Sequence, residues 1–268
     1  MLSDKTSGIL KNFAFFYLLI MGAFGCQSGT ATGIRKRSKF LQCLHAFNFF
    51  IVCLGCIDES LALWKGRLHF KQYIPSKRHK FGIKMFILCD CKTGFIIDFI
   101  VYSGSQTKLN YQKQLGVTGS IVTTLLDRFL NKGHSLFVDN YYSSPTLFEY
   151  LHQYKTGACG TVRKDRAGLP AFEEKQKPGE QVFYHTDNLL ALQWIDKRKV
   201  TMLSTLHEPI MVPTKKVHFV TKEQKMKLLC VKEYSNNRGF VDKYDMQISF
   251  SECTRRSIKW YKSSFFVC

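Results

Sequence analysis

Three aspartates stand where phosphodiester chemistry could be carried out: Asp58, Asp139 and Asp242. Asp58 follows the apolar run 47–57, Asp139 follows the run 135–138, and Asp242 opens a segment with helical spacing. Hydrolysis of a phosphodiester needs an activated water and a stabilised leaving oxygen, and two divalent ions about 4 Å apart can serve both. Three converging carboxylates repel one another unless a cation lies between them. Together they therefore predict a two-metal Mg²⁺ site.

Each aspartate also has an ordinary structural interpretation. A single aspartate after a strand is more often a turn residue or a helix cap. Asp90, Asp98 and Asp127 compete for the same role on grounds of periodicity. Spacing alone therefore does not select the three carboxylates.

The elements that must position them follow from hydropathy. Strands are expected at 47–57, ending at Asp58, and at 81–88, 95–102, 135–138, 158–162, 193–195 and 200–206. Helices are expected at 117–131, from Ser144-Pro145 onward, and at 242–266. Residues 164–190 are polar and predict a loop or the entry to an insertion. If the first and fourth strands are neighbours, this order describes an α/β fold with an RNase H-like mixed sheet.

Composition limits the class of partner. The chain has 268 residues, a formal net charge of +19 and 45% apolar residues, which excludes a wholly disordered, collagen-like or coiled-coil protein. A strongly basic chain favours a polyanion, either nucleic acid or an anionic membrane surface.

The ten cysteines do not form the framework of a secreted protein. Only Cys53 and Cys56 have the spacing of metal ligands, and no second pair completes a zinc site. We expect reduced, buried cysteines in an intracellular protein, and no zinc.

The first 45 residues are set apart from the rest. Residues 13–25 are apolar and follow Lys5 and Lys11, which is typical of the apolar region of a signal peptide but short for a membrane span. Two interpretations stay open for 1–45: a signal-like segment, which would make the protein secreted, or a misjoined start of the reading frame. The expected domain is 46–268.

The motifs resemble the piggyBac family of transposases. In the first half of the domain they are Ile57-Asp58-Glu59-Ser60, Lys65-Gly66-Arg67, Phe70-Lys71-Gln72-Tyr73-Ile74-Pro75, His79-Lys80-Phe81-Gly82-Ile83-Lys84 and Val101-Tyr102-Ser103-Gly104. In the second half they are Val138-Asp139-Asn140-Tyr141-Tyr142-Ser143-Ser144, Cys159-Gly160-Thr161-Val162-Arg163-Lys164, Met202-Leu203-Ser204-Thr205, Val241-Asp242 and Lys259-Trp260-Tyr261-Lys262.

The resemblance implies a nuclear cut-and-paste DNA transposase core. Asp58, Asp139 and Asp242 match the family's catalytic, metal-binding triad, with Asp245 as an accessory acid. The metal would be Mg²⁺, with Mn²⁺ as a substitute. A β-rich insertion within 163–235 would precede the last catalytic helix. The family cuts transposon ends through hairpin intermediates and joins them at TTAA targets. A homodimer is compatible with this, and no membrane partner is expected.

Eight basic residues would then face DNA: Lys65, Arg67, Lys77, Arg78, Lys80, Arg163, Lys164 and Arg166. Their alternative interpretation is a solvated charged face. Two functions stay open as well, an active transposase and a domesticated or decaying DNA-binding remnant without catalysis. The remnant is suggested by Phe240, which stands where the family usually has glycine.

Overall fold

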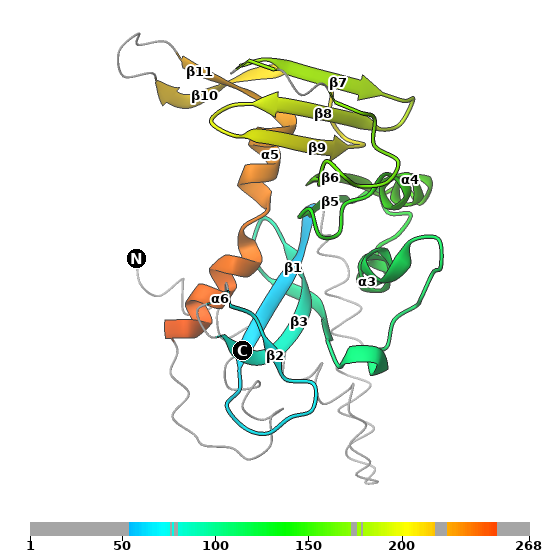
Figure 1. The fold of residues 1–268 in the computed structure, drawn as a ribbon, viewed down its shortest axis with the longest axis vertical. Helices are drawn as coiled ribbons and strands as arrows, with labels where there is room; N and C mark the ends of the chain where they lie inside the picture. Colours follow the sequence, from blue (N-terminus) through cyan, green and yellow to red (C-terminus); the bar gives the residue numbers. More distant parts are fainter. Residues whose placement is uncertain are drawn as a thin grey trace.

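The computed structural model describes residues 54–250, except 76, 78, 79, 173–175, 178 and 218–223. This part of the chain forms a nine-stranded mixed sheet in the order β2-β3-β1-β5-β6-β9-β8-β7, with β4 paired to β3 (Figure 1). Its strands are β1 (Leu54–Leu63), β2 (Gln72–Tyr73), β3 (Phe81–Asp90), β4 (Ile96–Val101), β5 (Ser135–Val138), β6 (Gly157–Thr161), β7 (Gln181–His185), β8 (Leu190–Ile195) and β9 (Lys199–Ser204).

Helices cover both faces of the sheet. α3 (Gly116–Leu126) and α4 (Pro145–Gln153) lie on one face, and α5 (Leu229–Asn237) and α6 (Phe240–Phe250) lie on the other (Figure 1). A short 3₁₀ helix spans Gly104–Gln106, and β10 (Met211–Val217) pairs with β11 (Gln224–Leu228) in a separate hairpin. Within the described residues, no helix is long and apolar enough to cross a membrane.

Side-chain alternation in the strands builds two separate hydrophobic cores. Cys56 and Phe137 point to the core beneath α5 and α6, whereas Ile57 and Val138 point to the core beneath α3 and α4. Strands buried on both faces are apolar along most of their length, which explains why their hydropathy was easy to recognise. The same alternation decides on which face the polar residue after each run will lie.

The predicted end of the first strand is wrong. β1 continues past Asp58 to Leu63, because β3 pairs with it antiparallel along the whole length, from Gly55↔Asp90 to Leu63↔Gly82. The expected residues 47–53 lie outside the described part of the chain. The predicted fold requires the first and fourth strands to be neighbours, and they are: β1 pairs with β5, in parallel, with the register Ile57↔Val138.

Several local predictions hold with small shifts. Helix α4 begins where Ser144-Pro145 placed it, and the Ser144 hydroxyl accepts a hydrogen bond from the Leu147 amide at 3.2 Å. Between the predicted strands 81–88 and 95–102, the turn Lys92-Thr93-Gly94 joins β3 to β4, with Gly94 in the left-handed region at φ 71°. Helix α3 ends at Leu126 rather than at residue 131, and turns follow it.

The second half contains elements that the hydropathy pattern did not predict. In the segment 164–190, predicted as a loop or the entry to an insertion, β7 forms a strand that pairs antiparallel with β8. Helix α5 was not predicted, since its sequence is mostly polar and only Cys230, Val231 and Tyr234 are buried. Strands β7, β8 and β9 continue the main sheet beyond β6 through the pairing of β9 with β6.

Candidate active site

Asp58 and Asp139 are neighbours because their strands run in parallel register. The last residue pair of β1 and β5 is Ile57↔Val138, so the next residues along the two chain segments are the two aspartates. Alternation places them on the same side as Cys56 and Phe137, which is the face covered by α5 and α6. This register brings the first two carboxylates together at one place in the sheet, as the sequence predicted.

Asp139 is held in place by two hydroxyl groups. Thr161, at the end of β6, donates to Asp139 Oδ1 at 2.9 Å, and the Tyr234 hydroxyl of α5 donates to the same oxygen at 3.3 Å. Burial raises the pKa of Tyr234 to about 12, and the nearby Asp139 charge acts in the same direction, so this hydroxyl stays protonated as a donor. The Asp139 carboxylate is therefore oriented before any ligand arrives.

Asp58 lies in a less polar position. Its pKa is raised to about 7, mainly by burial and in addition by the charges of Asp242 and Asp139. A hydrogen bond from the Glu59 amide at 2.8 Å and the charge of Lys77 oppose this rise. A carboxyl with this pKa is only partly ionised at neutral pH. A cation beside it would favour the ionised form.

Helix α6 brings two further carboxylates over this face of the sheet. Asp242 lies in its first turn, and Asp245 lies three residues later on the same side of the helix. The Asp242 side chain is 69% exposed and that of Asp245 only 22%. Burial raises the pKa of Asp245, and its carboxylate accepts a short hydrogen bond from the Ser60 hydroxyl of β1. This contact ties α6 to the strand that carries Asp58.

A lysine ammonium, Lys77 Nζ, lies against these carboxylates. It is 3.2 Å from Asp242 Oδ1 and 3.1 Å from Asp245 Oδ2, and it donates to the carbonyl of Glu59 at 3.0 Å. Burial lowers the pKa of Lys77, but the charges and hydrogen bonds of Asp245 and Asp242 outweigh burial and raise the pKa above its ordinary value. Lys77 is therefore positively charged at neutral pH.

The chemistry of the carboxylates fits a hard divalent cation, because all of them are oxygen ligands and the ionised form of Asp58 is destabilised by burial and by the charges of Asp242 and Asp139. Their arrangement does not complete such a site. Within the described residues, no group of three or more acidic, histidine or cysteine side chains is placed to hold a metal ion. The cation that contacts Asp242 and Asp245 is the ammonium of Lys77.

The basic residues predicted to face DNA divide into two groups. Exposed side chains are found at Lys65, Arg67, Lys80, Arg163 and Lys164. Lys77 and Arg166 point inward, and Arg78 lies outside the described residues. DNA contact by the exposed group stays a prediction.

Arg166 supports the loop that follows Asp139. Its guanidinium is half-buried and donates to the carbonyls of Asn140 at 2.8 Å and Tyr141 at 3.2 Å.

We expect Arg166→Met to lower the free energy of unfolding by about 1–3 kcal/mol, since two carbonyls lose a charged donor. Urea denaturation measures this, with the exposed Arg163→Met as the matched control, expected within about 0.5 kcal/mol of wild type. Equal stability of both variants with an equal loss of DNA affinity would make Arg166 a DNA contact instead.

Three residues of the site were not predicted. Thr161 follows Gly160, which pairs with Val138, so it occupies the position next to Asp139 on the adjacent parallel strand. A polar residue directly after an apolar strand was the available signal, as it was for Asp139. Nothing local in the sequence marks Tyr234 or Ser60, whose partners lie 95 and 185 residues away.

Phe240 does not disturb the start of α6. Its ring is partly buried against the core beneath α5 and α6 and lies beside Gly94, where an added Cβ would be 3.4 Å from the ring. The Lys243 ammonium is 4.5 Å from the ring centroid. The ring that replaces the family's usual glycine is therefore accommodated by packing.

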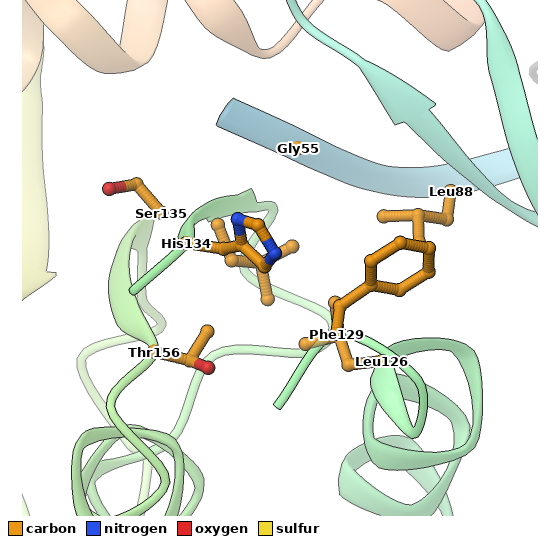
Figure 2. A pocket seen from close by; sticks show the side chains of 8 residues that line it. Gly55, Leu88, Leu126, Phe129, His134, Ser135 and Thr156 are labelled. Carbon is orange, nitrogen blue, oxygen red and sulfur yellow. The ribbon is translucent and has the colours of Figure 1, made fainter. Parts of the chain in front are cut away.

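A small hollow elsewhere is not part of this site. It is lined by Gly55, Leu88, Leu126, Phe129, His134, Ser135, Leu136 and Thr156 (Figure 2). Gly55 lies three residues before Asp58, and Ser135 lies four residues before Asp139. Its lining is mostly apolar, so it offers no second acidic centre.

Comparison with known proteins gives the class of this chain. The family model described as "Transposase IS4" matches residues 32–268. A solved piggyBac transposase synaptic complex with hairpin DNA, determined by cryo-electron microscopy, matches with a TM-score of 0.65 and 24% identity over 81% of this chain and 45% of that chain. The predicted fold class, a mixed α/β sheet flanked by helices, is confirmed by this match.

The chain belongs to the piggyBac family of transposases, as the resemblance implied. The human PiggyBac transposable element-derived protein 3 is 28% identical over 224 residues, which are 79% of this chain and 37% of that protein. The human Chimeric ERCC6-PGBD3 protein is also 28% identical, over 79% of this chain and 21% of that protein. The chain thus spans well under half the length of the relatives that it matches.

Proposed function

We propose that this chain is the catalytic core of a DNA transposase that cleaves and transfers DNA strands with the help of divalent metal ions. The observation that carries the proposal is the pair Asp58 and Asp139, side by side on adjacent parallel strands with Asp242 of α6 near enough to raise the pKa of Asp58. Family membership adds the reaction class. Transposon ends as the substrate, TTAA as the target, a homodimer and a nuclear location belong to this proposal.

The side chains of the site have separate roles in the proposed reaction. Thr161 and Tyr234 fix the Asp139 carboxylate by hydrogen bonds, so that it presents a constant geometry. Asp58 takes up or releases a proton near neutral pH. Asp58, Asp139 and Asp242 would hold the divalent cations, with Asp245 in support. When bound, such ions activate the attacking water and stabilise the leaving oxygen.

Nicking of supercoiled plasmid by the purified chain tests the proposal. We expect nicked circles with Mg²⁺ or Mn²⁺ and none with EDTA.

A second candidate function, DNA binding without cleavage, is favoured by the contact of the Lys77 ammonium with Asp242 and Asp245. Binding of DNA without nicking in either metal would favour this second function.

The exposed basic residues give a separate prediction about DNA affinity. If Lys65 and Arg67 each neutralise one phosphate, the double variant Lys65→Met/Arg67→Met should reduce the slope of log affinity against log salt by about 1.8, because each released counterion contributes about 0.9. Fluorescence anisotropy with a duplex oligonucleotide at several salt concentrations measures the slope. The charge-matched control is Lys197→Met/Arg198→Met in the turn between β8 and β9. Equal reductions in both double variants would show a diffuse basic surface rather than a DNA face.

A further inference from the structure

Lys77 is surrounded by oxygen atoms in the manner of a bound cation. Three oxygens from two elements lie at 3.0–3.2 Å from its Nζ: the carbonyl of Glu59 on β1, Asp242 Oδ1 and Asp245 Oδ2 on α6. An ammonium has three donors, so these contacts use its full hydrogen-bonding capacity. The side chain is only 22% exposed, although it belongs to the basic connector between β2 and β3.

These contacts place one positive charge among four carboxylates. Asp242 and Asp245 touch the ammonium, and Asp58 and Asp139 lie on the sheet beneath α6. The charges of Lys77, Asp242 and Asp139 all act on the pKa of Asp58, so these groups interact electrostatically. A divalent cation on Asp242 would have to occupy the same negative region as the ammonium, and like charges repel.

We propose that Lys77 is an internal competitor for the divalent cation: its ammonium holds Asp242 and Asp245 in the metal-free site and leaves Asp242 when a divalent ion binds. The inference rests on the proposed function, because it concerns the same carboxylates. Release is feasible because Asp242 is 69% exposed and a lysine side chain has four rotatable bonds leading to solvent.

Removal of the positive charge should tighten metal binding. We expect Lys77→Met to bind Mn²⁺ roughly tenfold more tightly than wild type in isothermal titration calorimetry of the full chain, since one repulsive charge is gone. Lys77→Arg keeps the charge and should bind Mn²⁺ about as weakly as wild type. Lys80→Met removes an exposed charge from the same connector and should change the affinity far less. Unchanged or weaker Mn²⁺ binding by Lys77→Met would overturn the inference and make Lys77 a structural clamp.

A second measurement uses the wild-type chain and does not depend on whether a variant folds. Acetylation of lysine amines, followed by mass spectrometry, should show Lys77 protected in EDTA and more reactive with Mn²⁺. The exposed Lys80 is the internal reference, with equal reactivity in both conditions. Continued protection of Lys77 at saturating Mn²⁺ would overturn the inference.

The outcomes separate this inference from the proposed function. Mn²⁺ binding by wild type that Asp58→Asn weakens, but Lys77→Met leaves unchanged, contradicts the inference alone. Absence of Mn²⁺ binding by wild type and Lys77→Met alike contradicts both. Tighter binding by Lys77→Met without any DNA nicking supports the inference and identifies the chain as a non-cleaving relative.

Discussion

Asp139→Asn should reduce metal-dependent plasmid nicking by roughly 10³-fold or more, because it removes one of the three negative charges that would hold the divalent cations. The amide oxygen of asparagine still accepts the hydrogen bonds that Thr161 and Tyr234 now donate to Asp139. The substitution is therefore nearly isosteric, and the fold should persist. Initial nicking rates at saturating Mg²⁺ or Mn²⁺ measure the effect.

The matched control is Asp127→Asn. Asp127 is exposed just beyond the end of α3, on the opposite side of the sheet from α5 and α6. It is one of the acids that periodicity alone could not distinguish from Asp139. We expect the wild-type nicking rate for this variant. Nicking by Asp139→Asn at the rate of Asp127→Asn would show that the assigned carboxylates are not the catalytic ones.

The sequence was most informative where an element is defined by its own residues. The apolar run 135–138 is buried on both faces of its strand, so both the strand and the position of Asp139 could be predicted. Ser144-Pro145 sets the start of α4 through local capping. These features need no distant partner, and they agree with the structure.

Prediction failed where a distant partner decides the outcome. Glu59 and Ser60 indicate the end of a strand because they are polar, yet β1 continues through them. Lys84 forms an ion pair with Glu59 at 2.7 Å, and Asp245 accepts the Ser60 hydroxyl hydrogen bond, so neither polar side chain is left without a partner. Local polarity cannot reveal contacts that span 185 residues.

Distant partners also decide the environment of Lys77. In the sequence it is one of several basic residues in a connector, and a solvated or DNA-facing role is the natural interpretation. The pairing of β3 with β1, followed by α6 crossing the sheet, brings its ammonium to acids 165 and 168 residues away. Chain topology, rather than local composition, gives this one lysine a different environment from Lys80.

The ionisation of Asp58 should make the stability of the folded chain depend strongly on pH. Its pKa is about 7 in the folded chain, whereas an unperturbed aspartate has a pKa of about 3.9. Between these pH values the folded state therefore binds a proton that the unfolded state has lost. Stability therefore falls as the pH rises from about 4 to about 7. About three pKa units correspond to at most about 4 kcal/mol. Asp58→Asn lacks this penalty, so we expect its stability relative to wild type to rise by up to that amount over this range.

Urea denaturation of both proteins in EDTA, between pH 4.5 and pH 8, measures this difference. Taking the difference matters because the raised pKa of Asp245 acts with the same sign in both proteins. Asp242, Asp139 and Lys77 face Asp58, so part of the gain comes from relieving repulsion between the acids once one charge is removed. Parallel stability curves for Asp58→Asn and wild type would mean that Asp58 is ionised throughout. In that case Lys77 and solvent would already neutralise the site without a divalent ion.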